Sequence, residues 1–400
     1  MKVSAIICEY NPLHNGHAHH IAETRRRGAT HILCILSSNF VQRGDVALLN
    51  KFDRARLAVM AGADLVIELP TPFSCASAEV YASGAVALID RLGIADELSF
   101  GCSADSTEEI DRLTEAALSA AQLCGDSIRA CMKEGRSYPA AVCEAVRQRY
   151  GEETAAQMQD PNNLLAIEYR KAMLRRKVSF SACAIPRRSV MHDSTLTEEG
   201  FASASYIRKA VAEGDPGYAT FMPDYAARCL SERIREGKTA TLRQMERAVL
   251  YRMRTIPEPE LLAVPDMNEQ LAGRFCAARN ANSLEELFAQ VKTRCYTMSR
   301  IRRIVMGAMI GIPKELLTAE PPYARVLAFN ERGRELMAAA QKKAVIPVST
   351  SLARLRGENS TCEAFVQTEE RASHVYGLAQ GAIASAEEDF RVRITMEQQP

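Results

Sequence analysis

The sequence predicts an α/β fold, with a Rossmann-like, doubly wound parallel sheet followed by a mostly α-helical C-terminal domain. Short, continuous apolar runs alternate with helical patterns through the first half of the chain. Buried parallel strands have such runs, and crossover helices fill the segments between them. After about residue 212 the strand-like runs nearly vanish, and proline and glycine separate helical segments. We therefore expect one domain over residues 1–212 and a second over residues 213–400.

Five apolar runs predict the strands of the sheet, and they lie at residues 3–8, 32–36, 65–69, 98–100 and 179–185. The segments between them predict helices that begin near His17, cover residues 52–61, 78–92, 106–123 and 155–175, and begin again at Ser203 or Ser205. The carboxyl ends of parallel strands share one edge of a sheet, where open α/β sheets bind ligands. The loops that follow the strands are therefore the first place to look for a site.

The composition is that of an ordinary soluble globular protein, with 47% hydrophobic and 25% charged residues. A formal net charge of +1 gives no overall field toward nucleic acid or membrane, so a polyanionic partner would need a local basic patch. The twelve cysteines include no Cys-x-x-Cys pair, which favours reduced thiols. No apolar stretch reaches the roughly 18 residues of a membrane span, and the first apolar run leads into Asn11 and Pro12 instead of a cleavage site. We expect a cytoplasmic protein with no membrane segment.

The segment EYNPLHNGH, from Glu9 to His17, predicts a nucleotide-binding turn between the first strand and its helix. A helix N-terminus offers free N–H groups and a partial positive charge to phosphate, and Gly16 lets a nucleotide lie close to the backbone. His14 and His17 can donate hydrogen bonds to phosphate oxygens as charge develops during attack at the α-phosphorus. The two imidazoles are therefore predicted to stabilise a transition state.

Two other interpretations of the histidine cluster stay open at this point. In the first, Asn15 caps the helix and the histidines are solvated in a turn. In the second, His14, His17, His19 and His20 bind zinc, but no carboxylate or thiolate set accompanies them at a familiar spacing. We expect no protein-bound zinc or other metal, and Mg²⁺ carried by the phosphates of ATP.

A second segment, FASASYIR from Phe201 to Arg208, carries hydroxyl groups and an arginine at the start of a helix. Ser203 and Ser205 can cap the helix and bind phosphate, and Arg208 can clamp a leaving pyrophosphate. The two segments together resemble the motifs of HIGH nucleotidyltransferases, the second resembling their ISSTxIR element with Ser205 in place of the usual threonine. The pair in this order is much more specific than either motif alone.

Longer segments resemble the bacterial tRNA(Met) cytidine acetate ligase family over nearly the whole chain. They are SSNFVQRGDVALLNKFDRARLAVMAGADLVIELP, LSFGC, DPNNLLAIEY, KTRCYTMSRIRRIVMGAMIGI and PPYARVLAFNERGREL. The resemblance implies a ligase that activates acetate with ATP to acetyl adenylate. It further implies acetyl transfer to N4 of the wobble cytidine, C34, of elongator tRNA(Met), which gives N4-acetylcytidine.

The resemblance also implies which residues bind ATP, beginning with the continuous segment Ile7, Cys8, Glu9, Tyr10, Asn11, Pro12, Leu13, His14, Asn15, Gly16, His17, Ala18, His19 and His20. Gly101, one or both of Asn162 and Asn163, and Arg187 with Arg188 complete this set. The chain has RRSVMHD where the family more often has a longer, glycine-containing stretch, so the alignment leaves the choice between Arg187 and Arg188 open. Ser38 stands where a glycine is expected before Asn39.

Gln42, Arg43 and Lys51 follow the second predicted strand and should lie at the same sheet edge as His14. Two cations and an amide there could meet phosphates or a carboxylate. A solvated loop is the alternative.

A basic patch in the second half of the chain is a candidate for tRNA binding, and its members are Lys292, Arg294, Tyr296, Arg300, Arg302 and Arg303. Arginines contact phosphates, and an aromatic ring can stack on an unpaired base. A solvated helix face is as good an account from composition, and the family resemblance favours tRNA.

Two rival functions share the phosphate-binding features. A small-molecule adenylyltransferase would also release pyrophosphate but leave AMP on its product, and a non-catalytic RNA-binding protein would keep only the fold. The basic second half favours an RNA substrate over a metabolite, and intact His14, His17 and Arg208 favour an enzyme. Neither a general base nor an oligomeric state follows from the sequence.

Overall fold

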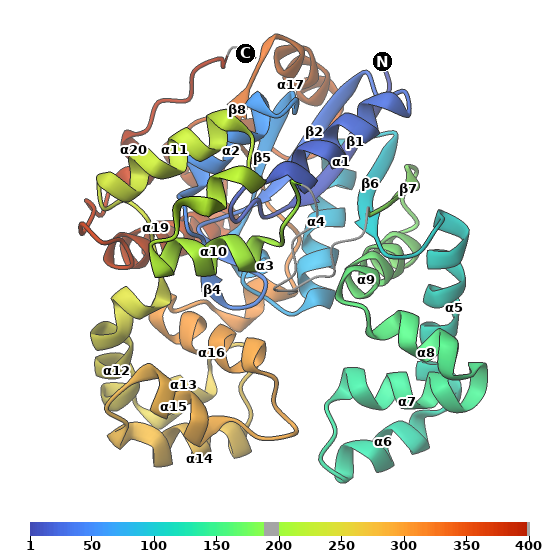
Figure 1. Ribbon diagram of the computed structural model, residues 1–400, viewed down its shortest axis with the longest axis vertical. Helices are drawn as coiled ribbons and strands as arrows, with labels where there is room; N and C mark the ends of the chain where they lie inside the picture. The colour runs from blue at the N-terminus through green and yellow to red at the C-terminus, as the bar shows by residue number, and fades with distance from the viewer. Residues whose placement is uncertain (188–199, 398–400) are drawn as a thin grey trace.

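The computed structural model describes residues 1–187 and 200–397. Its centre is a seven-stranded sheet with the order β7-β6-β1-β2-β5-β8-β9 (Figure 1). The parallel strands are β1 (Val3–Cys8), β2 (His31–Ser37), β5 (Leu65–Leu69), β6 (Glu97–Cys102) and β7 (Ser181–Pro186). The predicted Rossmann-like parallel sheet is confirmed.

The strand order fixes where a ligand can bind. The chain passes from β1 to β2 and β5 in one direction, and β6 then lies on the opposite side of β1. At such a switch point the connections leave in opposite directions, so a crevice opens outside the carboxyl ends of the two strands. In this sheet the crevice lies beyond β1 and β6.

Both faces of the sheet are covered, and successive residues of β1 and β2 alternate between them. Val3, Ala5 and Leu33 belong to one hydrophobic core, while Ile6 and Ile32 belong to another. The first core is covered by α4 (Ala78–Leu92), α5 (Thr107–Leu123), α9 (Pro161–Arg176) and α17 (Glu331–Lys343). The second is covered by α1 (Asn15–Arg26), α2 (Lys51–Met60), α10 (Ala204–Glu213) and α11 (Asp224–Arg235).

Two strands come from the part of the chain that was predicted to be helical. β8 (Ala324–Phe329) pairs antiparallel with β5, and β9 (Val348–Ser349) pairs with β8. The expectation that strands end near residue 212 was wrong at these positions, because a six-residue apolar run between helices cannot be told from a helical turn by periodicity. The proposed division of the chain at residue 212 stays a prediction, and the two parts share one sheet.

The remaining elements surround this sheet. Helices α12 (Glu246–Thr255), α13 (Glu258–Leu262), α14 (Glu269–Ala277), α15 (Leu284–Val291) and α16 (Met298–Ile310) pack around a third core. Helices α6 (Gly125–Lys133), α7 (Tyr138–Tyr150) and α8 (Glu152–Gln159) extend from α5, opposite the third core in Figure 1. The short pieces are β3 (Phe40–Val41), β4 (Asp45–Val46), α3 (Thr71–Ser74), α18 (Leu352–Arg356), α20 (Glu388–Arg391), and the 3₁₀ helices at Pro216–Phe221, Leu242–Met245, Ala278–Asn280 and Lys314–Leu317.

A buried ionic cluster ties the last part of the chain to the sheet. Lys51 Nζ lies 2.6 Å from Glu68 Oε1 and 2.7 Å from Asp389 Oδ1. Arg325 on β8 contacts Glu68 and Asp389 as well, and Glu369 on α19 (Ser360–Leu378) lies 3.8 Å from Lys51.

In the part of the chain that the structure describes, no helix has the length and apolar character needed to cross a membrane.

Candidate functional site

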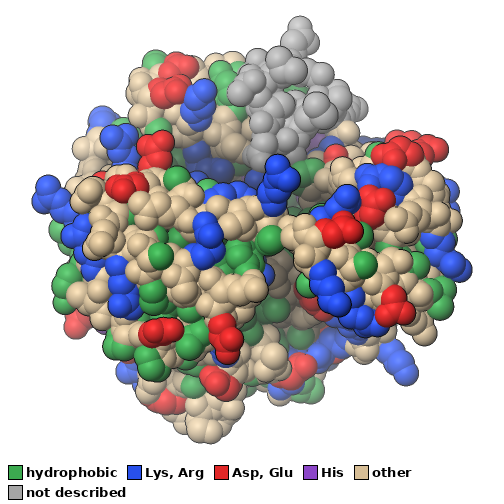
Figure 2. All heavy atoms as spheres, turned by 90° about the horizontal axis from the view of Figure 1, so that it is seen from below, with side chains coloured by type: hydrophobic (Ala, Val, Ile, Leu, Met, Phe, Trp, Pro, Cys, Tyr) green, Lys and Arg blue, Asp and Glu red, His purple; other side chains and the backbone are tan. Residues whose placement is uncertain are grey.

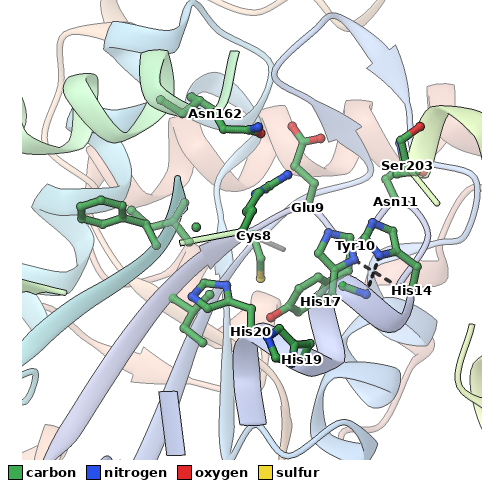
Figure 3. A pocket seen from close by; sticks show the side chains of 18 of the residues that line it. Cys8, Glu9, Tyr10, Asn11, His14, His17, His19, His20, Asn162 and Ser203 are labelled. Atoms are coloured by element: carbon green, nitrogen blue, oxygen red, sulfur yellow. Dashed lines mark hydrogen bonds between the residues drawn. The ribbon is translucent and has the colours of Figure 1, made fainter. Parts of the chain in front are cut away.

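A pocket opens at the switch point beyond β1 and β6, with side chains from β1, α1, α9, β7 and α10 around it (Figure 3). The structure brings most of the predicted nucleotide-site residues to its wall. They are Ile7, Cys8, Glu9, Tyr10, Asn11, His14, Gly16, His17, His19, His20, Arg43, Gly101, Asn162, Arg187, Ser203, Ser205 and Arg208.

The turn between β1 and α1 presents His14 at the helix N-terminus. Tyr10 has φ 45°, in the left-handed region that non-glycine residues rarely adopt, so the chain reverses sharply after β1. His14 is the N-cap of α1, the position for which Asn15 was the alternative. A Cβ on Gly16 would lie 3.0 Å from the His14 ring, so glycine keeps this cap open.

The hydrogen bonds of the cap fix the protonation of both imidazoles. His14 Nδ1 accepts from the Gly16 N–H at 3.1 Å, and His17 Nδ1 accepts from the His14 N–H at 3.3 Å. A neutral imidazole whose Nδ1 accepts carries its proton on Nε2. Burial, reinforced by His14 and Arg187, lowers the pKa of His17 well below its ordinary value, so His17 is neutral at physiological pH. The two rings stack with their centroids 3.7 Å apart. Figure 3 shows them next to each other.

His20 also lies on α1, and a hydroxyl group on β6 holds its ring in place. Its Nε2 lies 3.0 Å from Ser99 Oγ, and that hydroxyl lies 2.8 Å from Thr24 Oγ1. Burial, together with Arg187, lowers the pKa of His20 to about 3. The half-buried, neutral rings of His17 and His20 thus add polar groups to the pocket wall without adding positive charge.

Arg187 and Gly101 meet across the ends of β7 and β6. A Cβ on Gly101 would lie 3.0 Å from Arg187 Nε, so glycine leaves room for the guanidinium. Asn162, at the start of α9, donates from Nδ2 to Ser103 Oγ at 3.2 Å and also lines the pocket. An anionic ligand here would therefore meet the cationic Arg187 side chain in the pocket wall.

Helix α10 closes the pocket from the other side. Ser203 caps this helix by accepting from the Tyr206 N–H at 3.1 Å, as predicted for one of the two serines. Arg208 donates from Nη1 to the Asn11 carbonyl oxygen at 2.7 Å. This bond joins the two sequence motifs in space, although 197 residues separate its partners.

Several predicted residues lie outside the pocket wall. Asn163 supports the turn after β6, because its Oδ1 accepts from the Ser103 and Ala104 N–H groups. Lys51 is 1% exposed within the ionic cluster. Pro12, Leu13, Asn15, Ala18 and Gln42 belong to the surrounding turn, helix and loop rather than to the wall. Arg188 lies outside the described residues.

Sequence reasoning missed the apolar part of the wall, which Tyr81, Phe100, Leu165, Tyr169 and Ile185 form. Their apolar spacing fits ordinary core positions, so no sequence signal separates them from the rest of the core. The ring centroids of Phe100 and Tyr169 lie 6.0 Å apart. The pocket thus has a polar side and an aromatic side, which suits a nucleotide or a base.

Arg54 is a second residue that sequence reasoning missed. It is fully buried and donates to the carbonyl oxygens of Glu9 at 2.7 Å, Ser37 at 3.1 Å and Leu49 at 3.0 Å. It also contacts the carbonyl oxygen of Ser38, whose hydroxyl bonds to Thr71 and Ser74. Arg54 therefore holds the loop after β2 against the loop after β1.

Some residues of the predicted tRNA patch are exposed, and others are buried or bonded to neighbouring residues. Tyr296 is 7% exposed and bonds to Gln270, while Arg300 and Arg303 bond to Asp266. The Tyr296 ring is therefore packed inside the third core and cannot stack on a base. Arg302 contacts Asp45 at 3.4 Å, and Lys292 and Arg294 remain exposed. Figure 2 shows basic and acidic side chains mixed over the lower face.

The described residues contain no group of three or more histidine, cysteine or acidic side chains arranged to hold a metal ion. The polar side of the pocket is built from imidazoles, hydroxyls and arginines, together with one carboxylate among the described residues, Glu9. Such a set suits phosphate groups.

The chain is similar to proteins of known families along its whole length. It matches the model of the HIGH Nucleotidyl Transferase family over residues 1–389. A tRNA(Met) cytidine acetate ligase of Alkaliphilus metalliredigens is 32% identical, with 97% of each chain covered. The protein of that name from Caldanaerobacter subterraneus is also 32% identical, with 98% of each chain covered.

Two solved structures have the same fold. The apo crystal structure of Thermotoga maritima TmcAL has a TM-score of 0.93 and 26% identity, and the match covers 100% of both chains. A second crystal form of that protein, bound with alpha-thio ATP, has a TM-score of 0.89 over the same coverage.

Proposed function

Because this chain belongs to the HIGH nucleotidyl transferase family, and within it to the tRNA(Met) cytidine acetate ligases, we propose that it is an ATP-dependent ligase that acetylates tRNA(Met). The acceptor is N4 of the wobble cytidine of the elongator tRNA, and the acyl donor is acetate. Because tRNA is the substrate, the proposed place of action is the cytoplasm.

The observation that carries this proposal is the state of the two imidazoles. Backbone N–H groups of the α1 cap donate to Nδ1 of His14 and of His17, so each neutral ring carries its proton on Nε2. Donors fixed before the reaction cost no reorganisation when negative charge grows on the α-phosphate. An acetate oxygen then attacks the α-phosphorus, the bond to the bridging oxygen breaks, and pyrophosphate leaves.

The other charged residues have roles in the same step. Arg208 and the hydroxyls of Ser203 and Ser205, at the N-terminus of α10, are positioned to bind the pyrophosphate. Mg²⁺, carried by the phosphates, supplies further charge neutralisation. Arg187 follows β7 directly and lines the pocket, so it can hold another anionic part of the nucleotide.

The RNA is proposed to be held mainly by the part of the chain after residue 212. Lys292 and Arg294 are the exposed members of the predicted patch. Arg300 and Arg303 serve the packing of α16 instead, since Asp266 engages both.

Incubation with labelled acetate, ATP and bulk tRNA tests the function. Label in RNA, with release of AMP and pyrophosphate, supports the ligase. AMP retained on a small molecule, with no label in RNA, would support an adenylyltransferase. Failure to bind ATP in a titration would support a non-catalytic RNA-binding protein.

A further inference from the structure

Glu9 is the one carboxylate among the described residues that line the pocket. It follows β1 directly, so its backbone is fixed by the sheet at the switch point. In Figure 3 its side chain projects into the pocket and away from the rings of His14 and His17. The imidazole donors and the carboxylate therefore face different parts of one cavity.

The position of Glu9 is held from two sides. Its Oε1 accepts from the Gln42 N–H at 2.9 Å, and its own carbonyl oxygen accepts from Arg54 at 2.7 Å. Three arginines on three segments act on its charge, namely Arg43 after β3, Arg54 on α2 and Arg208 on α10. The carboxylate thus has a defined orientation.

The other titratable groups around Glu9 stay uncharged. Its uncharged titratable neighbours include Tyr81 on α4, Tyr169 on α9, Cys8 on β1 and Cys75 after α3, and burial raises the pKa of each. Burial also raises the pKa of Glu9, against the Gln42 N–H and the three arginines, which lower it. The carboxylate is consequently a stronger base than one in water.

A carboxylate is not suited to hold the phosphates of ATP, because it repels phosphate oxygens and has no hydrogen to donate to them. It suits the second step of the proposed reaction, in which an amine loses a proton. We propose that Glu9 is the general base for acetyl transfer and accepts the proton that the cytidine N4 amine releases. This inference rests on the proposed function.

In this acetyl-transfer step one bond forms, one bond breaks and one proton moves. The N4 lone pair attacks the carbonyl carbon of acetyl adenylate, and a C–N bond forms. The bond from that carbon to the phosphate oxygen breaks, and AMP leaves with the electron pair. One N4 proton passes to a carboxylate oxygen of Glu9 and then to solvent.

The Glu9→Gln variant separates the two steps, because it keeps the shape of the side chain and removes the base. Acetate-dependent exchange of pyrophosphate into ATP reports the first step and, in the variant, should fall less than tenfold. Single-turnover transfer from preformed acetyl adenylate to tRNA reports the second and should fall about a hundredfold or more. Retained exchange also shows that the variant is folded.

The pH dependence of single-turnover transfer is a second readout. In the wild type the rate rises with pH as Glu9 loses its proton and then levels, whereas the Glu9→Gln variant lacks that rise. The Glu9→Asp variant keeps a carboxylate and should recover part of the transfer rate with a pH-dependent rise.

Two results would overturn the role of Glu9. Equal losses of exchange and transfer in Glu9→Gln would make Glu9 part of the ATP or Mg²⁺ site, and an unchanged transfer rate would remove it from the chemistry. A wild-type protein that leaves tRNA unacetylated would instead refute the proposed function, so the two failures are distinguishable.

Discussion

At the scale of single residues, the histidines of the site depend on backbone hydrogen bonds for their tautomer. His14 both caps α1 through its ring and donates its own N–H to the ring of His17. Loss of either ring therefore changes the neighbour as well as the phosphate contact. The proposed role of the pair is worth about 2.7–4 kcal/mol of barrier for each preorganised donor.

The His17→Ala variant tests this role. Acetate-dependent pyrophosphate exchange should fall roughly a hundredfold or more, because one donor to the α-phosphate is lost. His374 on α19 is exposed and lies away from the pocket wall, so His374→Ala is a matched control that should keep the wild-type rate. An unchanged exchange rate in His17→Ala would contradict the phosphate role.

The sequence predicted which types of residue line this pocket better than it predicted which individual residues do so. Glycine, histidine, serine and arginine at motif spacing identified most of the polar wall. Lys51 could not be placed, because its burial depends on Glu68 and Asp389, which only the folded sheet brings near it. Asn162 and Asn163 are adjacent, and the turn after β6 determines which of them faces the pocket.

At the scale of elements, the β3–β4 hairpin connects the pocket to the third core. Gly44 lies in this hairpin with φ +73°, next to Arg43 in the pocket wall. A Cβ there would lie 2.3 Å from the backbone nitrogen of Arg303, in the middle of α16. The hairpin and α16 therefore pack backbone against backbone.

The Gly44→Ala variant should lose about 3 kcal/mol of unfolding free energy, from the left-handed φ and the forced shift of α16. Gly28 has φ +99° and no neighbour within 4 Å of a built Cβ. The Gly28→Ala variant should therefore lose only the unfolding free energy that a left-handed φ costs, about 1–2 kcal/mol. Urea unfolding measures both. Equal losses in the two variants would show that contact with α16 contributes nothing.

Strands and helices of the first half were predictable because each is a continuous apolar run or a periodic helix. β8 was missed because its position depends on β5, whose free edge accepts it as an antiparallel neighbour. That pairing is a tertiary event, and the run from Ala324 to Phe329 contains no local sign of it. The pocket does not depend on β8, which explains why the site could be located without it.

At the scale of the whole molecule, the buried ionic cluster joins α2, β5, β8, α19 and α20. Interaction with Lys51 and Arg325 lowers the pKa of Asp389 to about 2, despite its burial. Burial and the neighbouring Glu68 raise the pKa of Glu369 to about 8. The folded protein thus keeps a proton on Glu369 that the unfolded chain loses near pH 4.

Stability should therefore fall as pH rises. A carboxyl group with a raised folded-state pKa contributes stability that is fully present below its unfolded pKa and is lost as pH rises through about 8. The slope is at most about 1.4 kcal/mol per pH unit for one proton. Urea unfolding from about pH 7 to about pH 8 should show this loss in the wild type and not in Glu369→Gln, because His17 and His20, whose lowered pKa values make stability rise with pH, act only below about pH 6.5.

Glu363 lies on the same helix with its side chain 42% exposed, so Glu363→Gln is the control and should keep the wild-type slope. If the pH slope of Glu369→Gln equalled that of the wild type, the proton would reside elsewhere. Asp389 does not interfere in this range, because its contribution changes only as pH falls toward about 2.

The most direct test of the central claim is acetyl transfer to a defined nucleotide. The protein is incubated with ATP, labelled acetate and elongator tRNA(Met) transcripts that carry cytidine or uridine at the wobble position, and the digested nucleosides are analysed by mass spectrometry. We expect N4-acetylcytidine from the cytidine transcript and no label in the uridine transcript. Equal labelling of both transcripts, or AMP attached to a product with no acetyl group in RNA, would contradict the account.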